Sequence, residues 1–280
     1  MWSISIYNGA SPFELKPAHD GPVLGSADVT DVPADFVADP FLLHRDNTWH
    51  MFFEVMNSET KRGEIGLARS HDALAWSYEV IVLKEPFHLS YPYIFEWEDE
   101  LYMIPETLGS GAVCLYKAID FPFRWSRKAR LIEGRFADPS IFRCQDCWWM
   151  FACSTPYEHD TLVLYYASEL TGPWTQHPKS PLIRTDKRRA RPAGRILNVN
   201  NRLFRFAQDC VPQYGSSVRA FEVTDLTTTS YAEVELNSSP ILKASGEGWN
   251  AMGMHHIDAH EQFKGTWLAC VDGLMVPPRV

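Results

Sequence analysis

Carboxyl groups recur in this sequence at one position relative to short apolar runs. Asp39 and Asp138 precede prolines that open such runs, while Glu54 and Glu106 follow the next apolar run along the chain. Two carboxyl groups held together can divide the roles of general acid and general base, because crowding raises the pKa of one of them. Glycoside hydrolysis is the reaction class that depends on such a pair.

Other polar residues at or near the same positions are candidates for binding a ligand. They are Glu54, His88, Tyr91, Arg191, Gln208, Asp209, His255, His256 and Asp272. An arginine suits a carboxylate or a phosphate, and the remaining groups suit sugar hydroxyls. Structural roles remain open for several of them. An Asp before Pro often caps a turn, a Glu at a strand end can point to solvent, and Arg191 can pair with a neighbouring acid.

Few features of the sequence indicate a bound metal ion or cofactor. The adjacent histidines 255 and 256 could lie in the core, and a histidine pair alone is a weak indication of a metal ion. Cys144 and Cys147 form a CxxC without the second pair that a zinc ribbon needs. Neither a phosphate-binding loop, a dinucleotide fingerprint nor a nucleophile elbow occurs. We therefore expect no metal ion and no cofactor.

An internal repeat sets the spacing of these residues. The steps Asp39-Pro40, Tyr91-Pro92, Asp138-Pro139 and Arg191-Pro192 lie 52, 47 and 53 residues apart by subtraction. Each step leads through a strand-like run and a polar two-residue turn into a second run, and a third run follows. A fourth run begins near an aromatic residue: Trp76, Trp125, Trp174 or Tyr231. Four strands in a unit of about 50 residues are typical of a propeller blade.

The fifth unit has only two strand-like runs, at residues 254–258 and 266–270, before the chain ends. Residues 4–7 resemble the third run of the other units, and residues 22–24 resemble the end of the fourth. The sequence therefore predicts one all-β domain over residues 1–280. It would be a five-bladed β-propeller with four-stranded blades, whose last blade is closed by the N-terminal strands, so that no sheet edge is left open.

Composition narrows the classes of partner. The net charge of −9 argues against nucleic acid or an anionic membrane as the main partner. We found no apolar stretch long enough to span a membrane, and the first residues lack the basic and apolar regions of a signal peptide. We therefore expect a cytoplasmic protein with reduced cysteines, no membrane span and a carbohydrate or glycoconjugate ligand.

Four segments carry a resemblance to a known family. Residues 85–92, 103–106, 191–194 and 207–210 resemble the N-terminal domain of plant glucosamine inositolphosphorylceramide transferases, and the likeness runs from Trp2 to Asp272. That family is similar in architecture to five-bladed glycoside hydrolases of families 43, 32 and 130. In the plant proteins the transferase chemistry is attributed to a separate C-terminal domain, so the resemblance does not imply transfer here.

The resemblance to family 43 implies roles for individual residues. Asp39 matches the general base and Asp138 the supporting acid. The general-acid Glu expected in a later blade is replaced by Arg191, so Glu106 or Glu54 would have to serve. Our first hypothesis is a glycoside hydrolase-like enzyme acting on a glycan or glycoconjugate. In it Asp39 is base or nucleophile, Glu106 is the acid and Asp138 tunes the site. The alternatives are a non-catalytic carbohydrate-binding propeller and a scaffold whose channel mouth binds a protein.

Overall fold

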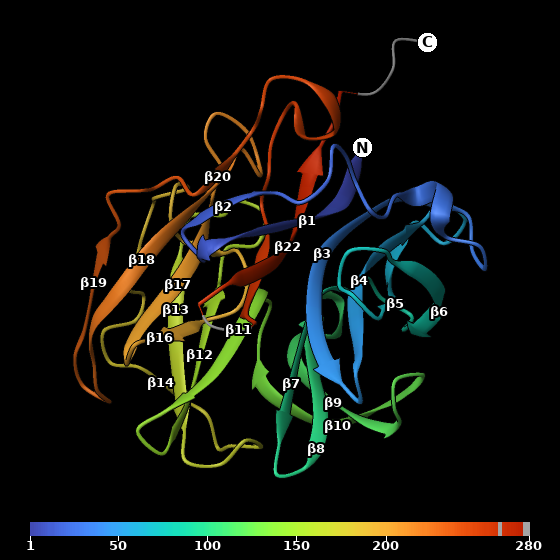
Figure 1. Ribbon diagram of the computed structural model, residues 1–280. Coiled ribbons are helices and arrows are strands. Elements are labelled where there is room, and N and C mark those ends of the chain that lie inside the picture. Colours follow the sequence, from blue (N-terminus) through green and yellow to red (C-terminus); the bar gives the residue numbers. More distant parts are fainter. Residues whose placement is uncertain (263–264, 277–280) are drawn as a thin grey trace.

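The computed structural model describes residues 1–262 and 265–276, which form five β-sheets arranged as blades around a central channel (Figure 1). From the innermost strand outward, blade 1 consists of β3 (Ala34–Arg45), β4 (Thr48–Asn57), β5 (Arg62–Ser70) and β6 (Ser77–Leu83). Blade 2 consists of β7 (Ser90–Trp97), β8 (Glu100–Glu106), β9 (Ala112–Asp120) and β10 (Arg124–Glu133). Blade 3 consists of β11 (Ala137–Cys144), β12 (Cys147–Cys153), β13 (Leu162–Ala167) and β14 (Thr175–Gln176).

In blade 4 two short inner strands, β15 (Arg191–Pro192) and β16 (Leu197–Val199), pair with β17 (Arg202–Asp209). Outside them follow β18 (Ser217–Leu226), β19 (Tyr231–Glu235) and β20 (Leu242–Lys243). Blade 5 consists of β21 (Ile257–Glu261), β22 (Trp267–Leu274), β1 (Trp2–Ser11) and β2 (Glu14–Pro17). Three short 3-10 helices, η1 (Ser26–Asp28), η2 (Leu108–Ser110) and η3 (Gly248–Asn250), complete the described elements. None of the helices among these residues is long and apolar enough to cross a membrane.

The N-terminal strand closes the ring, as the repeat predicts. β1 runs antiparallel beside β22, with Ile4 opposite Asp272 and Ile6 opposite Cys270, so the blue and red ends of the chain share one sheet (Figure 1). Leu24 then forms a bridge with Ile4, just as Ile183 does with Leu162 in blade 3. The likeness of residues 22–24 to the ends of the other units is therefore confirmed.

Tight hairpins join the two inner strands of blades 1 to 4. Both turn residues have positive φ in each case: Asp46-Asn47, Glu98-Asp99, Gln145-Asp146 and Asn200-Asn201. Such turns match the twist of the strands that they connect. Cys144 and Cys147 face each other across the third turn, each with a free thiol, which agrees with the expected hairpin.

The X-Pro steps are β-bulges near the mouth of the channel. The pairing of the two inner strands slips between Ala38 and Phe41 in blade 1, and likewise at the Tyr91 and Asp138 steps. Asp39, Tyr91 and Asp138 have φ values of 52°, 48° and 51°, in the left-handed region that non-glycine residues rarely adopt. Bulges redirect side chains, and strain of this kind gathers at functional sites. The repeat therefore marks three equivalent strained positions.

Candidate functional site

The mouth of the channel gathers buried acids from four blades. The two inner strands of each blade are antiparallel, so a bulge at the start of the first lies beside the end of the second: Ala38 pairs with Glu54, and Ser90 with Glu106. The acids at these positions are each 6% exposed or less: Asp39, Glu54, Glu106, Asp138 and Asp272. Four of them, Asp39, Glu54, Glu106 and Asp138, have pKa values raised first by burial, with neighbouring carboxylates adding to the effect.

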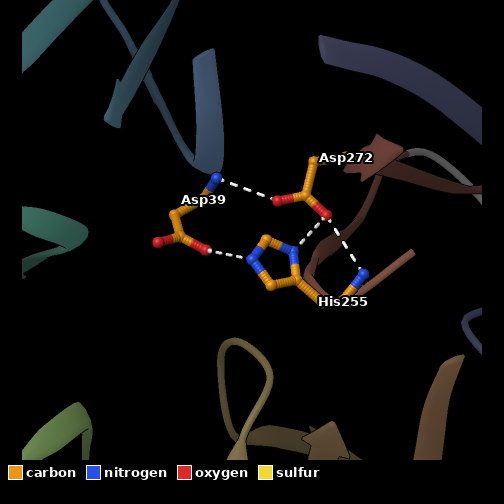
Figure 2. Close-up of side chains that lie close together, drawn as sticks. All are labelled: Asp39, His255 and Asp272. Atoms are coloured by element: carbon orange, nitrogen blue, oxygen red, sulfur yellow. Dashed lines mark hydrogen bonds and ion pairs between the residues drawn. The ribbon is translucent and has the colours of Figure 1, made fainter. Parts of the chain in front are cut away.

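Figure 2 shows the first cluster, in which His255 lies between two aspartates. Its Nδ1 is 2.7 Å from Asp272 Oδ1, and that oxygen also accepts the backbone N–H groups of His255 and His256. The other oxygen of Asp272 accepts the backbone N–H of Asp39 at 3.0 Å. Burial opposes ionisation of Asp272, but the charge of His255 and these hydrogen bonds outweigh it and lower the pKa of Asp272. Asp272 is therefore the ionised anchor of this cluster.

Asp39 is bound much more loosely than Asp272. Its Oδ1 lies 3.6 Å from His255 Nε2 and 3.8 Å from His256 Nδ1, and it is buried without a hydrogen bond among residues 1–262 and 265–276. Burial raises the pKa of Asp39 to about 7, although His255 opposes the shift. Trp2 stacks on His255 with ring centroids 4.0 Å apart and so fixes the imidazole. This carboxyl can thus accept or release a proton near neutral pH.

The second cluster centres on Arg191. Its guanidinium donates to both oxygens of Asp138, at 2.6 and 3.2 Å, and to Glu106 Oε2 at 3.4 Å. Gln208 adds a hydrogen bond to Asp138 at 2.8 Å, and the backbone N–H of Asp138 donates to Glu106. Burial raises the pKa of Asp138 to about 7 against the opposing charge of Arg191. Arg191 thus partly neutralises two of the mouth acids.

Glu54 and His88 form a third, separate pair. His88 Nδ1 accepts the backbone N–H of Gly63 at 2.8 Å, so the proton of a neutral His88 sits on Nε2, which lies 3.3 Å from Glu54 Oε1. Desolvation lowers the pKa of His88 and, with the neighbouring acids, raises the pKa of Glu54 well above its usual value. A Cβ on Gly63 would lie 2.8 Å from Glu54 Oε1 and 2.2 Å from the Leu89 carbonyl oxygen. A glycine is therefore required where these residues meet.

The residues that could hold a cation are Asp39, His255 and Asp272, whose potential ligand atoms lie within 4.8 Å of one another. Both oxygens of Asp272 already accept hydrogen bonds, so this set offers few free ligand atoms. His256 is fully buried, and within the described part of the chain neither of its ring nitrogens has a hydrogen-bond partner. Burial lowers the pKa of His256 to about 4, so its ring is neutral.

Two candidate residues do not present free polar groups at the mouth. The Tyr91 hydroxyl lies inside the channel, where it bonds Ser140 at 2.7 Å and both backbone groups of Gly194. Asp209 follows Gln208 on β17, so its side chain points to the opposite face of the sheet, where it pairs with Arg219 at 2.8 Å and Arg188 at 3.5 Å. Both side chains are therefore engaged with other parts of the protein, and the expectation that they contact a ligand stays a prediction.

Sequence reasoning missed several residues around Arg191. His159, in the loop after β12, lies with its Nδ1 3.0 Å from the guanidinium, and Tyr214, in the loop after β17, places its ring 5.1 Å from it. Both loops follow the ends of second strands, which the repeat marks as lining the mouth. The position of these loops after the second strands was the signal that could have identified His159 and Tyr214. It does not show which residues of an irregular loop turn toward the mouth.

The sequence comparison gives the family of this chain. Residues 1–274 match the family described as "Glucosamine inositolphosphorylceramide transferase 1, N-terminal". The chain belongs to this family. It is 36% identical to glucosamine inositolphosphorylceramide transferase 1 of Oryza sativa subsp. japonica and 34% identical to that of Arabidopsis thaliana, covering 99% and 97% of this chain. The matches span only 40% and 39% of the length of those relatives.

Solved structures with the same fold are glycoside hydrolases. The catalytic domain of the family 62 α-L-arabinofuranosidase from Coprinopsis cinerea superposes with a TM-score of 0.62 at 11% identity, covering 97% of this chain and 96% of that chain. An α-L-arabinanase mutant from Cellvibrio cellulosa gives a TM-score of 0.58 at 16% identity, covering 84% and 85%. At these identities the likeness establishes the five-bladed fold alone.

Proposed function

We propose that the mouth of this propeller binds a glycan or glycoconjugate and hydrolyses a glycosidic bond in it. The observation that carries the proposal is the contrast between acids that are held by hydrogen bonds and acids that are not. Asp39 and Glu54 each keep a buried oxygen without a hydrogen bond among the described residues, whereas Asp272 and Asp138 are held by donors. Buried carboxyl oxygens without hydrogen bonds are costly, and a substrate or a catalytic water would supply the missing hydrogen bonds.

In this proposal Asp39 acts as the general base and a protonated glutamate acts as the general acid. Glu54 suits the acid better than Glu106, because the Arg191 guanidinium stabilises the charged form of Glu106. The nearest potential cation of Glu54 is His88, whose own pKa is lowered by burial. Glu54 therefore stays protonated over a wider pH range, as a general acid must. Asp138 and Arg191 would tune and orient the site.

A second candidate function is carbohydrate binding without catalysis. It is favoured by Arg191, which stands where the family 43 pattern has its general-acid Glu and pairs with Asp138 and Glu106. The relatives are named glucosamine inositolphosphorylceramide transferase 1, and a propeller that presents a glycoconjugate during glycan synthesis is consistent with that name. Either function places the ligand in the same mouth.

A screen of aryl glycosides and oligosaccharides, with measurement of both binding and product release, tests the proposal. We expect wild-type turnover with a bell-shaped pH dependence. The acidic limb would lie near pH 7, where Asp39 loses its proton, and the alkaline limb would report Glu54. Asp39→Asn and Glu54→Gln should each lower kcat by about 100-fold or more while binding persists. Turnover that survives both changes would contradict catalysis here. Binding without any turnover by the wild type would favour the second candidate.

A further inference from the structure

A groove leads outward from the second acid cluster. It has a volume of about 380 Å³ and is lined by His88, Glu106, Leu108, Gly109, Arg135, Pro156, Tyr157 and Arg191. Glu106 and Arg191 form its buried floor, while Arg135 and Tyr157 are exposed at its rim. The volume falls in the range of small-molecule sites. A ligand that is bound by the mouth acids can therefore place a neighbouring group in this groove.

Hydrogen bonds connect the rim of the groove directly to its floor. Arg191, whose other nitrogens hold Asp138 and Glu106, donates from Nη1 to the Pro156 carbonyl at 3.1 Å and contacts His159 Nδ1 at 3.0 Å. Thr155 closes the same loop through a 2.9 Å hydrogen bond to Asp160. The loop that carries Tyr157 is thus fixed by the residue that organises the acids. A ring placed against Tyr157 would lie at a defined position relative to them.

The arginine at the floor of the groove has its charge balanced by acids, whereas the arginine at the rim has no such partner among the described residues. The charge of Arg191 is offset by Asp138 and Glu106. Arg135 donates to the Tyr157 hydroxyl at 2.7 Å and lies 5.5 Å from the centre of that ring, and no ion pair joins it to an acid within the described ranges. Its other guanidinium N–H groups are therefore available to an oxyanion, which arginine binds through two parallel hydrogen bonds.

Tyr157 supplies an apolar surface for a sugar ring. Tyr157 is 67% exposed, although a large aromatic side chain gains from burial. With Leu108 and Pro156 it gives the groove an apolar side against which the C–H face of a saturated ring can pack. An aromatic face beside an unpaired guanidinium matches a ring that carries a negative substituent.

We infer that this groove, named here the Arg135–Tyr157 subsite, binds a sugar unit bearing a phosphate or carboxylate group. The inference rests on the proposed function, because it assigns the unit next to the one held by the mouth acids. It names the ligand class as an anionic glycan or glycoconjugate. The acids of the floor would meet the neutral part of the ligand, and Arg135 its charge.

Calorimetric titration with glucose 1-phosphate, glucuronate and glucose tests this subsite. We expect the wild type to bind at least one anionic probe more tightly than glucose, with an affinity that falls as salt is raised. Arg135→Gln should weaken that binding by about five- to tenfold and leave glucose binding unchanged. Tyr157→Ala should weaken all three probes, and Tyr157→Phe should retain most of the affinity. Arg127→Gln, on the outer strand β10 of the same blade, is the matched control and should change nothing.

The outcomes separate this inference from the catalytic proposal. The subsite is supported if the wild type binds either anion more tightly than glucose and Arg135→Gln loses this preference. This holds even if no glycoside is hydrolysed. Equal binding of glucose and both anions, absence of binding to either anion, or an Arg135→Gln variant that matches the wild type would overturn it. Hydrolysis of anionic glycans with unchanged kcat and KM in Arg135→Gln would leave the mouth catalytic and reject the subsite.

Discussion

Two buried aspartates of the channel, Asp39 at the mouth and Asp258 deeper inside, have opposite electrostatic surroundings. Asp258 accepts hydrogen bonds from Arg195 at 2.6 and 3.3 Å, from His260 at 2.9 Å and from the backbone of Leu42 at 2.6 Å. These partners outweigh burial and lower the pKa of Asp258, whereas burial raises that of Asp39 to about 7. Equal burial therefore does not imply an equal role. The hydrogen-bond network is complete around Asp258, whose charge serves the fold, and incomplete around Asp39, where we propose that a ligand binds.

Breaking the hydrogen-bond network around Asp258 should have the largest effect on stability. Asp258→Asn removes the charge opposite Arg195, whose side chain is only 17% exposed and whose guanidinium also bonds the Ile94 and Leu42 carbonyls. We expect a loss of about 3–5 kcal/mol in the free energy of unfolding, since an unpaired buried charge remains. Urea denaturation measures it. The exposed Asp225→Asn serves as control, and a loss no larger than the control's would contradict a structural role for this pair.

Within the mouth, Asp272→Asn should also destabilise, but less. The amide can replace only one of the two oxygens that accept N–H groups from His255, His256 and Asp39. We expect a loss of about 2–3 kcal/mol, measured in the same way. Asp39→Asn is the comparison variant. Asp39 Oδ1 has only long contacts to His255 and His256 and no hydrogen bond among the described residues, so the change should not destabilise the protein. Equal losses in both variants would show that the two acids of this cluster do not differ.

Glu54→Gln should stabilise the protein while impairing the proposed function. The change replaces a buried carboxyl of raised pKa by a neutral group of the same shape. We expect a gain of about 1 kcal/mol at pH 8, the range found when a strained functional group is removed. Thermal unfolding beside the exposed control Glu59→Gln measures the gain. A lower melting temperature would mean that Glu54 is a structural acid like Asp258.

Stability should also change with pH through the mouth acids. Asp39 and Asp138 have folded pKa values of about 7, above the unfolded value of about 3.9. The folded state therefore binds more protons between these limits, and stability from these groups is full below pH 4 and lost as pH rises to 7. We expect the double variant Asp39→Asn/Asp138→Asn to reduce this slope in unfolding measurements from pH 4 to 8. An unchanged slope would assign the dependence to other groups.

The sequence revealed the fold because the repeat has a simple physical origin. Blades 1 to 4 share the same kind of turn pair and blades 1 to 3 share the same X-Pro bulge, so Asp39, Tyr91 and Asp138 recur at similar spacing. Register then predicted which strand ends share the mouth. It could not show which acids have partners, since that depends on side chains from other blades, such as Arg191 on Asp138. Register also did not separate Gln208 from Asp209, whose side chains point to opposite faces of the sheet, as those of adjacent residues on a strand do.

The closure of the ring by β1 has a consequence for the order of folding. Its partner β22 lies more than 250 residues away, with Trp2 opposite Leu274 and Gly9 opposite Trp267. Contacts between such distant segments form slowly, because the loop between them must first be closed at an entropic cost. During synthesis β1 must therefore remain unpaired until β22 has emerged. His255 and Asp272 belong to the same late blade, so the site around Asp39 would be assembled only in the final step.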